Sequence, residues 1–405
     1  MSKKTFTLLI LFLLLVIGLG WYFFFRGGSA PTPAGTATST PDDLFPFGQR
    51  PVATSTEPAG GSTTTVIDIT GKGNVPAPKL RQVWKDPTAG SGFLTSSGVT
   101  AAVRFVDRAT GHIYEAPTDT LGETQLSNVT IPQVNEALFA SNGSEMIMRY
   151  LKDDGAIQSF YARLSTSTTG SAIEGYFLPQ NIRDIYMLGD KILYFDPSLT
   201  TGSLIQSGAD GSKRLSIMSS DLRDWLLSWN STSTIFLATR PSGTVDGHGY
   251  LFSIPKGSIT KIVNAIKGLS GSISPSGQYV FLSAQDGTGI ASASYDNATQ
   301  KTTTLSVRTL SDKCGWSNVQ KAVIYCAVPR SVSAGTYPDD WYQGLTSFSD
   351  TLWKIDMSTG ETELVFDPSF DALQEMDMIK LSVDPTDTYL SFTNKKDMSL
   401  WLYKF

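Results

Sequence analysis

Apolar and polar residues alternate along most of the chain in a unit of one form, two short apolar runs on either side of a polar turn. The stretch "ISPSGQYVFLSA" at 273–284 shows this unit, with the turn Ser-Pro-Ser-Gly followed by β-branched and aromatic side chains. Such runs on either side of a Gly-containing turn predict paired antiparallel strands. No long amphipathic helical pattern follows the first 25 residues, so we expect an all-β fold.

The unit recurs at a nearly constant interval. It appears seven times, and the turn residues before each second strand are Gly98, Gly143, Asp190, Thr232, Gly277, Gln320 and Asp387. Successive turns are 45, 47, 42, 45, 43 and 67 residues apart, and the long interval contains one insertion. Most intervals hold a second hairpin, for example at 351–366. A period of 40–50 residues with four strands each is typical of propeller blades, so the sequence predicts a seven-bladed β-propeller with four-stranded antiparallel blades.

The seventh repeat has three strands before Phe405, and the segment "KLRQVW" at 79–84 belongs to no repeat of its own. We expect this N-terminal segment to form the outermost strand of blade seven and to close the ring. A loosely packed lead-in is the alternative.

The first residues decide the predicted compartment. Residues 5–25 carry no charge and lie between Lys4 and Arg26. About 20 apolar residues cross a bilayer as a helix, and lysines stay on the cytoplasmic side. We therefore predict a cytoplasmic tip and transmembrane helix at 1–26, a disordered tether rich in Pro, Ser, Thr and Gly at 27–78, and the propeller at 79–405 outside the cytoplasm. A cleaved signal peptide is the alternative, and it would export the propeller as well.

Two turns resemble those of a known group of proteins. The stretches "SPSGQYVFLS" at 274–283 and "VDPTDTYLSF" at 383–392 are similar to the Ser-Pro-Asp-Gly-Lys turn of TolB-type and WD-repeat-like bacterial propellers, as is the hairpin Trp353–Gly360. The resemblance covers 79–405 and implies the fold. It implies little about function, because propellers host unrelated activities. The Trp-Asp dipeptide of true WD repeats and the Asp-box of sialidases are absent from the sequence, and the Gly-His pair does not recur in every repeat.

The insertion at 330–350 in the sixth repeat holds the candidate site. It contains the cluster Tyr337, Asp339, Asp340, Trp341 and Tyr342. Exposed Trp and Tyr are frequent anchors of protein interfaces, so these residues are predicted to bind a ligand or partner. The alternative is a lid whose aromatic side chains pack on the propeller or fill its channel. The connection at 367–377 is expected on the same face of the ring.

Cys314 and Cys326 lie six residues on either side of the turn at Gln320. In a regular hairpin they would face each other across neighbouring strands, at a Cα separation that a disulfide tolerates. Outside the cytoplasm, a disulfide is expected, with buried free thiols as the alternative.

Other chemistry has little support in the sequence. His112 and His248 lie outside any metal-ligand pattern, and no Gly-x-Ser-x-Gly motif is present, so we predict no catalytic residue, metal or cofactor. A net charge of −5 with 17% charged residues argues against nucleic-acid binding. The sequence thus favours a protein- or glycan-binding scaffold of the cell envelope, anchored by its N-terminal helix. A propeller-type hydrolase acting on envelope polysaccharide or peptide and a sensor subunit of an envelope complex are the alternatives.

Overall fold

The computed structural model describes residues 76–96, 98–165, 172–196, 202–222 and 224–405. None of the helices within these ranges has the length and hydropathy of a membrane span. The predicted transmembrane helix at 5–25 and nearly all of the predicted tether lie outside the described residues.

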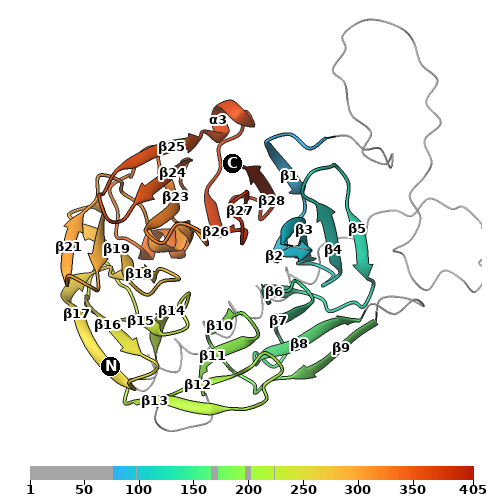
Figure 1. Cartoon of the computed structure of the whole chain (residues 1–405), viewed down its shortest axis with the longest axis horizontal. Helices are drawn as coiled ribbons and strands as arrows, with labels where there is room; N and C mark the ends of the chain where they lie inside the picture. The colour runs from blue at the N-terminus through green and yellow to red at the C-terminus, as the bar shows by residue number, and fades with distance from the viewer. Residues whose placement is uncertain (1–75, 97, 166–171, 197–201, 223) are drawn as a thin grey trace, which may run out of the picture. The chain divides into compact units, whose positions relative to one another are not determined.

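Seven four-stranded antiparallel sheets form a ring, with the first strand of each sheet nearest the centre (Figure 1). The predicted all-β, seven-bladed β-propeller is therefore confirmed. The first three blades contain β2 (Thr88–Ser96), β3 (Val99–Asp107), β4 (Ile113–Pro117) and β5 (Thr124–Ser127); β6 (Val134–Phe139), β7 (Glu145–Leu151), β8 (Ile157–Ser165) and β9 (Ala172–Phe177); and β10 (Ile185–Leu188), β11 (Lys191–Phe195), β12 (Gly202–Gly208) and β13 (Leu215–Ser220).

Blades four to six contain β14 (Trp225–Ser228), β15 (Thr234–Thr239), β16 (Asp246–Ser253) and β17 (Ser258–Lys267); β18 (Ser270–Ile273), β19 (Tyr279–Asp286), β20 (Gly289–Asp296) and β21 (Lys301–Thr304); and β22 (Cys314–Trp316), β23 (Val323–Pro329), β24 (Asp350–Asp356) and β25 (Thr362–Phe366). Blade seven contains β26 (Met378–Val383), β27 (Tyr389–Asn394), β28 (Leu400–Lys404) and β1 (Leu80–Trp84). Within the described residues, three short helices lie in connections, namely η1 (Ser311–Lys313), α2 (Asp339–Tyr342) and α3 (Pro368–Asp371).

The N-terminal strand closes the ring as predicted. The order of blade seven is β1-β28-β27-β26, and Leu80 lies opposite Tyr403. The side chains of β1 also contact blade one. The ring centres of Trp84 and Phe105 are 5.3 Å apart, and the guanidinium of Arg81 donates to the carbonyl oxygen of Thr120 at 2.9 Å. One strand therefore joins the last blade to the first.

The core is divided among the interfaces between blades. Alternate residues of each strand face a neighbouring blade, so apolar side chains of adjacent sheets form one cluster per interface. The described residues hold seven such clusters, from Val106 and Met148 between blades one and two to Phe105 and Leu402 between blades seven and one. Ring closure thus buries both faces of every sheet.

The two cysteines are opposed across the first hairpin of blade six. Cys314 of β22 pairs in register with Cys326 of β23, with a Cα–Cα separation of 4.1 Å and a disulfide between them. The predicted disulfide is confirmed.

We call the upper face the side of the ring that carries the connections from second to third strand and from each blade to the next. The connections 330–349 and 367–377 both belong to it. They touch, because the amide of Asp350 donates to the carbonyl oxygen of Met376 at 2.9 Å and the guanidinium of Arg330 donates to Ser369 Oγ at 3.1 Å. The expected shared face is confirmed.

Candidate functional site

The blade-six insertion, residues 330–349, crosses the upper face from blade six towards blades five and four. The amide of Gly335 donates to the carbonyl oxygen of Thr288 at 2.9 Å, and Gln285 Nε2 of β19 donates to the carbonyl oxygen of Gly335 at 3.1 Å. Farther along, the amide of Gly243 in blade four donates to Asp339 Oδ2 at 2.6 Å. The insertion is therefore fixed to blades five and four by hydrogen bonds of its backbone and of the Asp339 side chain.

The five predicted site residues differ in exposure. Tyr337 and Trp341 are 1% and 4% exposed and pack with Ile290, Leu310 and Phe348 beneath the insertion. This packing agrees with the alternative interpretation of the insertion, a lid whose aromatic side chains pack on the propeller. Their role in binding a partner stays a prediction.

The remaining three predicted residues reach solvent to different degrees. Asp339 and Asp340 are partly exposed, and each accepts from a backbone amide, that of Gly243 and that of Thr336 at 2.8 Å. Tyr342 is 43% exposed, and its hydroxyl donates to Asp312 at 3.0 Å. Tyr342 therefore offers the largest accessible aromatic surface of the predicted group.

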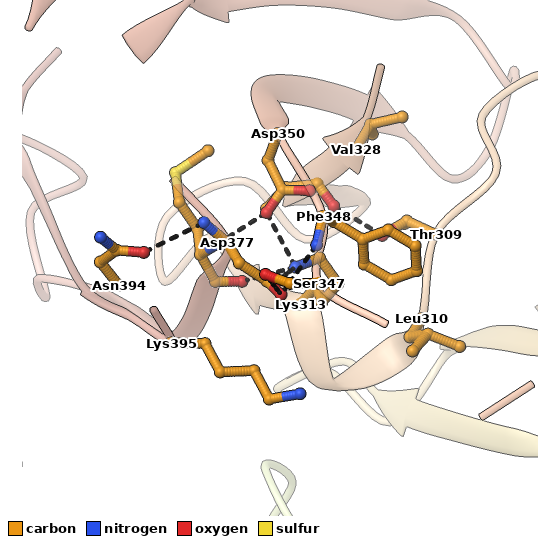
Figure 2. Close-up of polar contacts among 12 residues, drawn as sticks. Thr309, Leu310, Lys313, Val328, Ser347, Phe348, Asp350, Asp377, Asn394 and Lys395 are labelled. Atoms are coloured by element: carbon orange, nitrogen blue, oxygen red, sulfur yellow. Dashed lines mark hydrogen bonds and ion pairs between the residues drawn. The ribbon is translucent and has the colours of Figure 1, made fainter. Parts of the chain in front are cut away.

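A buried charged cluster holds the insertion in place (Figure 2). Lys313 of η1 is completely buried and forms ion pairs with Asp350, at 2.8 Å, and with Asp377. Asp377 also accepts from Trp341 Nε1 and from the amide of Phe348, both at 3.0 Å. A buried charge needs such partners because its desolvation costs several kcal/mol. The cluster joins η1, the insertion and the entry to blade seven.

The two carboxyl groups of this cluster differ in their proton affinity. Burial raises the pKa of Asp350 to about 6, against the attraction of Lys313. Burial also acts to raise the pKa of Asp377, but Lys313 and the hydrogen bonds from the insertion lower it below its ordinary value. Asp377 is thus the ionised anchor, and Asp350 is the group that takes up a proton first as the pH falls. Asp350 Oδ1 is buried without a hydrogen-bond partner within the described part of the chain.

A second polar group, the axial group, gathers on the upper face around the innermost strands. Its members are Asp184, Tyr186, Asp224, Arg240, Asp312 and Tyr342. Arg240 forms ion pairs with Asp184 and, at 2.9 Å, with Asp224. The hydroxyl of Tyr342 donates to Asp312 at 3.0 Å, and the amide of Leu227 donates to the hydroxyl of Tyr186 at 3.2 Å.

Burial affects the pKa values of Asp312 and Tyr342 although both side chains are exposed. Burial is the largest cause that raises the pKa of each.

Three apolar side chains stand out from connections of the upper face. Leu345 of the insertion, Phe370 of α3 and Leu373 are 73%, 79% and 89% exposed. Helix α3 is held by Asp367, whose side chain accepts from the amide of Ser369 at 3.0 Å and pairs with Arg330. These apolar groups are therefore presented on connections that are hydrogen-bonded to the ring.

Sequence reasoning did not identify Lys313, Asp350, Asp377 or most of the axial group. These residues lie in separate connections, and none forms a local motif. Their position directly beside predicted inner strands was the only available signal. The histidines are engaged by the protein: His112 Nδ1 lies 3.1 Å from Gln125 Nε2, and His248 Nδ1 accepts from the amide of Ala265 at 3.2 Å. Among the residues the structure describes, no group of three or more His, Cys, Asp or Glu could hold a metal ion.

Comparison with known proteins finds likeness in structure and not in sequence. No protein-family model and no curated protein matches the chain. An oligogalacturonate lyase in complex with manganese is 14% identical with a TM-score of 0.51, and the match covers 81% of this chain and 91% of that one. The oligogalacturonate lyase of Vibrio parahaemolyticus is 11% identical with a TM-score of 0.51, over 81% and 92% of the two chains. The tricorn protease is 8% identical with a TM-score of 0.50, over 82% of this chain and 35% of the protease. At such identities the likeness shows the propeller fold alone.

Proposed function

We propose that the protein is a membrane-anchored binding module of the cell envelope, whose propeller stands outside the cytoplasm and binds a protein partner through its upper face. The uncharged segment 5–25 supports the anchor. The disulfide supports an oxidising compartment, since such bonds persist there and are rare in the cytoplasm.

The observation that carries the binding proposal is the exposure of Leu345, Phe370 and Leu373 on one face. Large exposed apolar groups that gather on a face mark interaction sites more often than single ones do. Burying a Leu or Phe side chain contributes about 1.5–3 kcal/mol, so three would supply roughly 5–9 kcal/mol before the costs of association. This amount suits a partner that presents apolar side chains of its own.

A propeller-type hydrolase is the alternative function. The lyases and the protease that share the fold do so at 14% identity or less, so their activities do not favour this alternative. It predicts turnover of envelope polysaccharide or peptide by the purified protein.

The test is quantitative cross-linking of the full-length protein in its native membrane, followed by identification of the captured proteins. The variant Phe370→Ser/Leu373→Ser removes apolar groups from the upper face. The matched control is Leu215→Ser/Val319→Ser, at positions 59% and 60% exposed on the opposite face. We expect a partner captured by the wild type and the control to fall at least about tenfold with the upper-face variant. Equal capture by both variants would refute the proposal.

A further inference from the structure

A pocket lies between blades five and six, where the outermost strand of blade five ends. Strand β21 has four residues, whereas its neighbour β20 has eight. Beyond Thr304 the chain packs inward, since the side chains of Leu305 and Val307 are buried against blade six. The outer part of the facing surface of blade six is therefore not covered by a strand. The pocket there has a volume of about 390 Å³, which is in the range of small-molecule sites.

Each of the two blades supplies one wall of this pocket. The connection that follows β21 contributes Ser306, Val307 and Arg308. Blade six contributes Trp353 of β24, Thr362 of β25, and residues 328–332 from the end of β23 and the start of the insertion. Both edges of β24 are paired within the blade, so this wall presents side chains and not a free strand edge to which an extended peptide could be added.

The lining of the pocket is positively charged. Among the described residues it includes two arginines and no acid. Arg330 forms an ion pair with Asp367 and donates to Ser369 Oγ at 3.1 Å, so its charge is compensated. Arg308 is exposed, and its guanidinium forms no ion pair or hydrogen bond within the described part of the chain. One positive charge is thus uncompensated, and it favours a ligand that carries a carboxylate or another anionic group.

Hydroxyl groups and an indole ring line the pocket beside this charge. The hydroxyl groups of Ser306, Ser331 and Thr362 form no hydrogen bond to the described part of the chain, so each can donate to a ligand and accept from it. The side chain of Trp353 is half-buried, and its Nε1 donates to Thr351 Oγ1 at 2.8 Å, which holds the ring in position. A fixed aromatic ring can cover the apolar C–H face of a sugar with little loss of side-chain entropy.

We propose that the pocket between blades five and six binds a uronic acid unit of an acidic polysaccharide. Arg308 pairs with the carboxylate of the sugar, Trp353 covers its ring, and the three hydroxyl side chains exchange hydrogen bonds with its hydroxyl groups. A neutral sugar leaves the charge of Arg308 without a partner, and an acidic peptide side chain has no ring for Trp353 to cover. This ligand goes beyond the protein partner proposed above, and either proposal can fail without the other.

The experiment is calorimetric titration of the full-length protein in an uncharged detergent without a sugar headgroup. The probes are the hexamers of β-linked mannuronate and glucuronate, each matched with the neutral hexamer of the same sugar, mannohexaose and cellohexaose. We expect at least one uronate to bind with a dissociation constant below about 1 mM, and its neutral counterpart to bind at least about tenfold more weakly. Failure of both uronates, or equal or tighter binding of the neutral counterparts, would overturn the proposal.

An acidic peptide tests whether charge alone explains the binding. Hexaglutamate with blocked ends carries as many carboxylates as the uronate hexamers, and it should bind at least about tenfold more weakly than the better uronate. If hexaglutamate binds as tightly as that uronate or more tightly, the assignment to a saccharide is wrong.

Variants locate the binding. Arg308→Met should weaken uronate binding at least about tenfold, whereas Arg308→Lys keeps the charge and should weaken it about threefold. Arg163→Met is the control, because the side chain of Arg163 is 63% exposed on β8 of blade two. Thermal unfolding of each variant shows whether it is folded. A folded Arg308→Met protein that binds the uronate as the wild type does would overturn the assignment to this pocket, as would an equal loss in Arg163→Met.

Discussion

Replacement of Lys313 by methionine tests whether the buried charged cluster stabilises the upper face. Methionine keeps most of the length of the side chain and removes the ammonium group. The carboxyl groups of Asp350 and Asp377 then remain buried, both at 0% exposure, without their cation. Removing one partner of a buried ion pair costs about 3–5 kcal/mol, because the remaining charge is uncompensated. We expect Lys313→Met to lose about 4 kcal/mol of unfolding free energy at pH 7.

That loss can be converted into a melting temperature. The entropy of unfolding near the midpoint is about 2 cal/mol/K per residue. For a propeller of roughly 330 residues, the total entropy of unfolding is therefore about 0.7 kcal/mol/K. A loss of about 4 kcal/mol therefore lowers the midpoint by about 6 °C. Lys301→Met is the control, because Lys301 lies exposed on β21, and its change should stay within about 0.5 kcal/mol.

The loss should depend on pH in a definite direction. In the wild type the pKa of Asp350 is raised to about 6, so the folded state binds more protons than the unfolded state between about pH 4 and pH 6, and this group lowers stability as the pH rises through that window. Asp377 acts in the opposite direction, because its lowered pKa contributes stability that is lost as the pH falls below about 4. Without Lys313 both carboxyl groups have higher pKa values in the folded state. The loss of unfolding free energy in Lys313→Met should therefore be smaller at pH 5 than at pH 7.

The assay is thermal and urea unfolding of residues 76–405, followed by tryptophan fluorescence at pH 5 and pH 7 without reductant. The variant Lys313→Met/Asp350→Asn/Asp377→Asn removes all three charges and should regain most of the stability. The reasoning about uncompensated charge is wrong if Lys313→Met has the melting temperature of the wild type at pH 7. It is also wrong if the triple variant is no more stable than the single one.

Two further predictions concern the disulfide of blade six and the strand that closes the ring. Cys314→Ser/Cys326→Ser removes a bond between positions 12 residues apart and should cost up to about 3 kcal/mol by loop entropy. In urea unfolding, the variant should have the same free energy of unfolding as the reduced wild type. A variant as stable as the oxidised wild type would contradict this estimate. A chain that begins at Lys85 lacks β1 and exposes the edge of β28, so it should melt at lower temperature and self-associate in size-exclusion chromatography. A peptide of residues 76–84 added in trans should reverse both effects, and a truncated chain that stays monomeric at the wild-type midpoint would show that β1 is dispensable.

Much of the fold was predictable because propeller blades are local units. The hairpin around Gly277 and its repeats carry their turn residues and alternating strands within about 15 residues of sequence, and Gly277 adopts the left-handed φ of 73° that its turn requires. The pairing of β1 with β28 spans the whole propeller, yet it followed from counting strands, since three strands remained in the last repeat. The disulfide followed from register, because Cys314 and Cys326 are equidistant from one turn.

The candidate site was less predictable, because its contacts are not local. The aromatic composition of the insertion indicated an unusual segment, but exposure of Tyr342 and burial of Tyr337 and Trp341 depend on how the insertion lies across blades five and four. Asp377 and Lys313 are 64 residues apart in the chain, and no periodicity relates them.

The sequence by itself determined the all-β repeat, the number of blades, the closing strand and the covalent bond, because each depends on spacing along the chain. Only the tertiary structure decided which charged side chains meet, since ring closure brings connections of separate blades to one axis. For that reason the buried Lys313 cluster became visible only in the folded molecule.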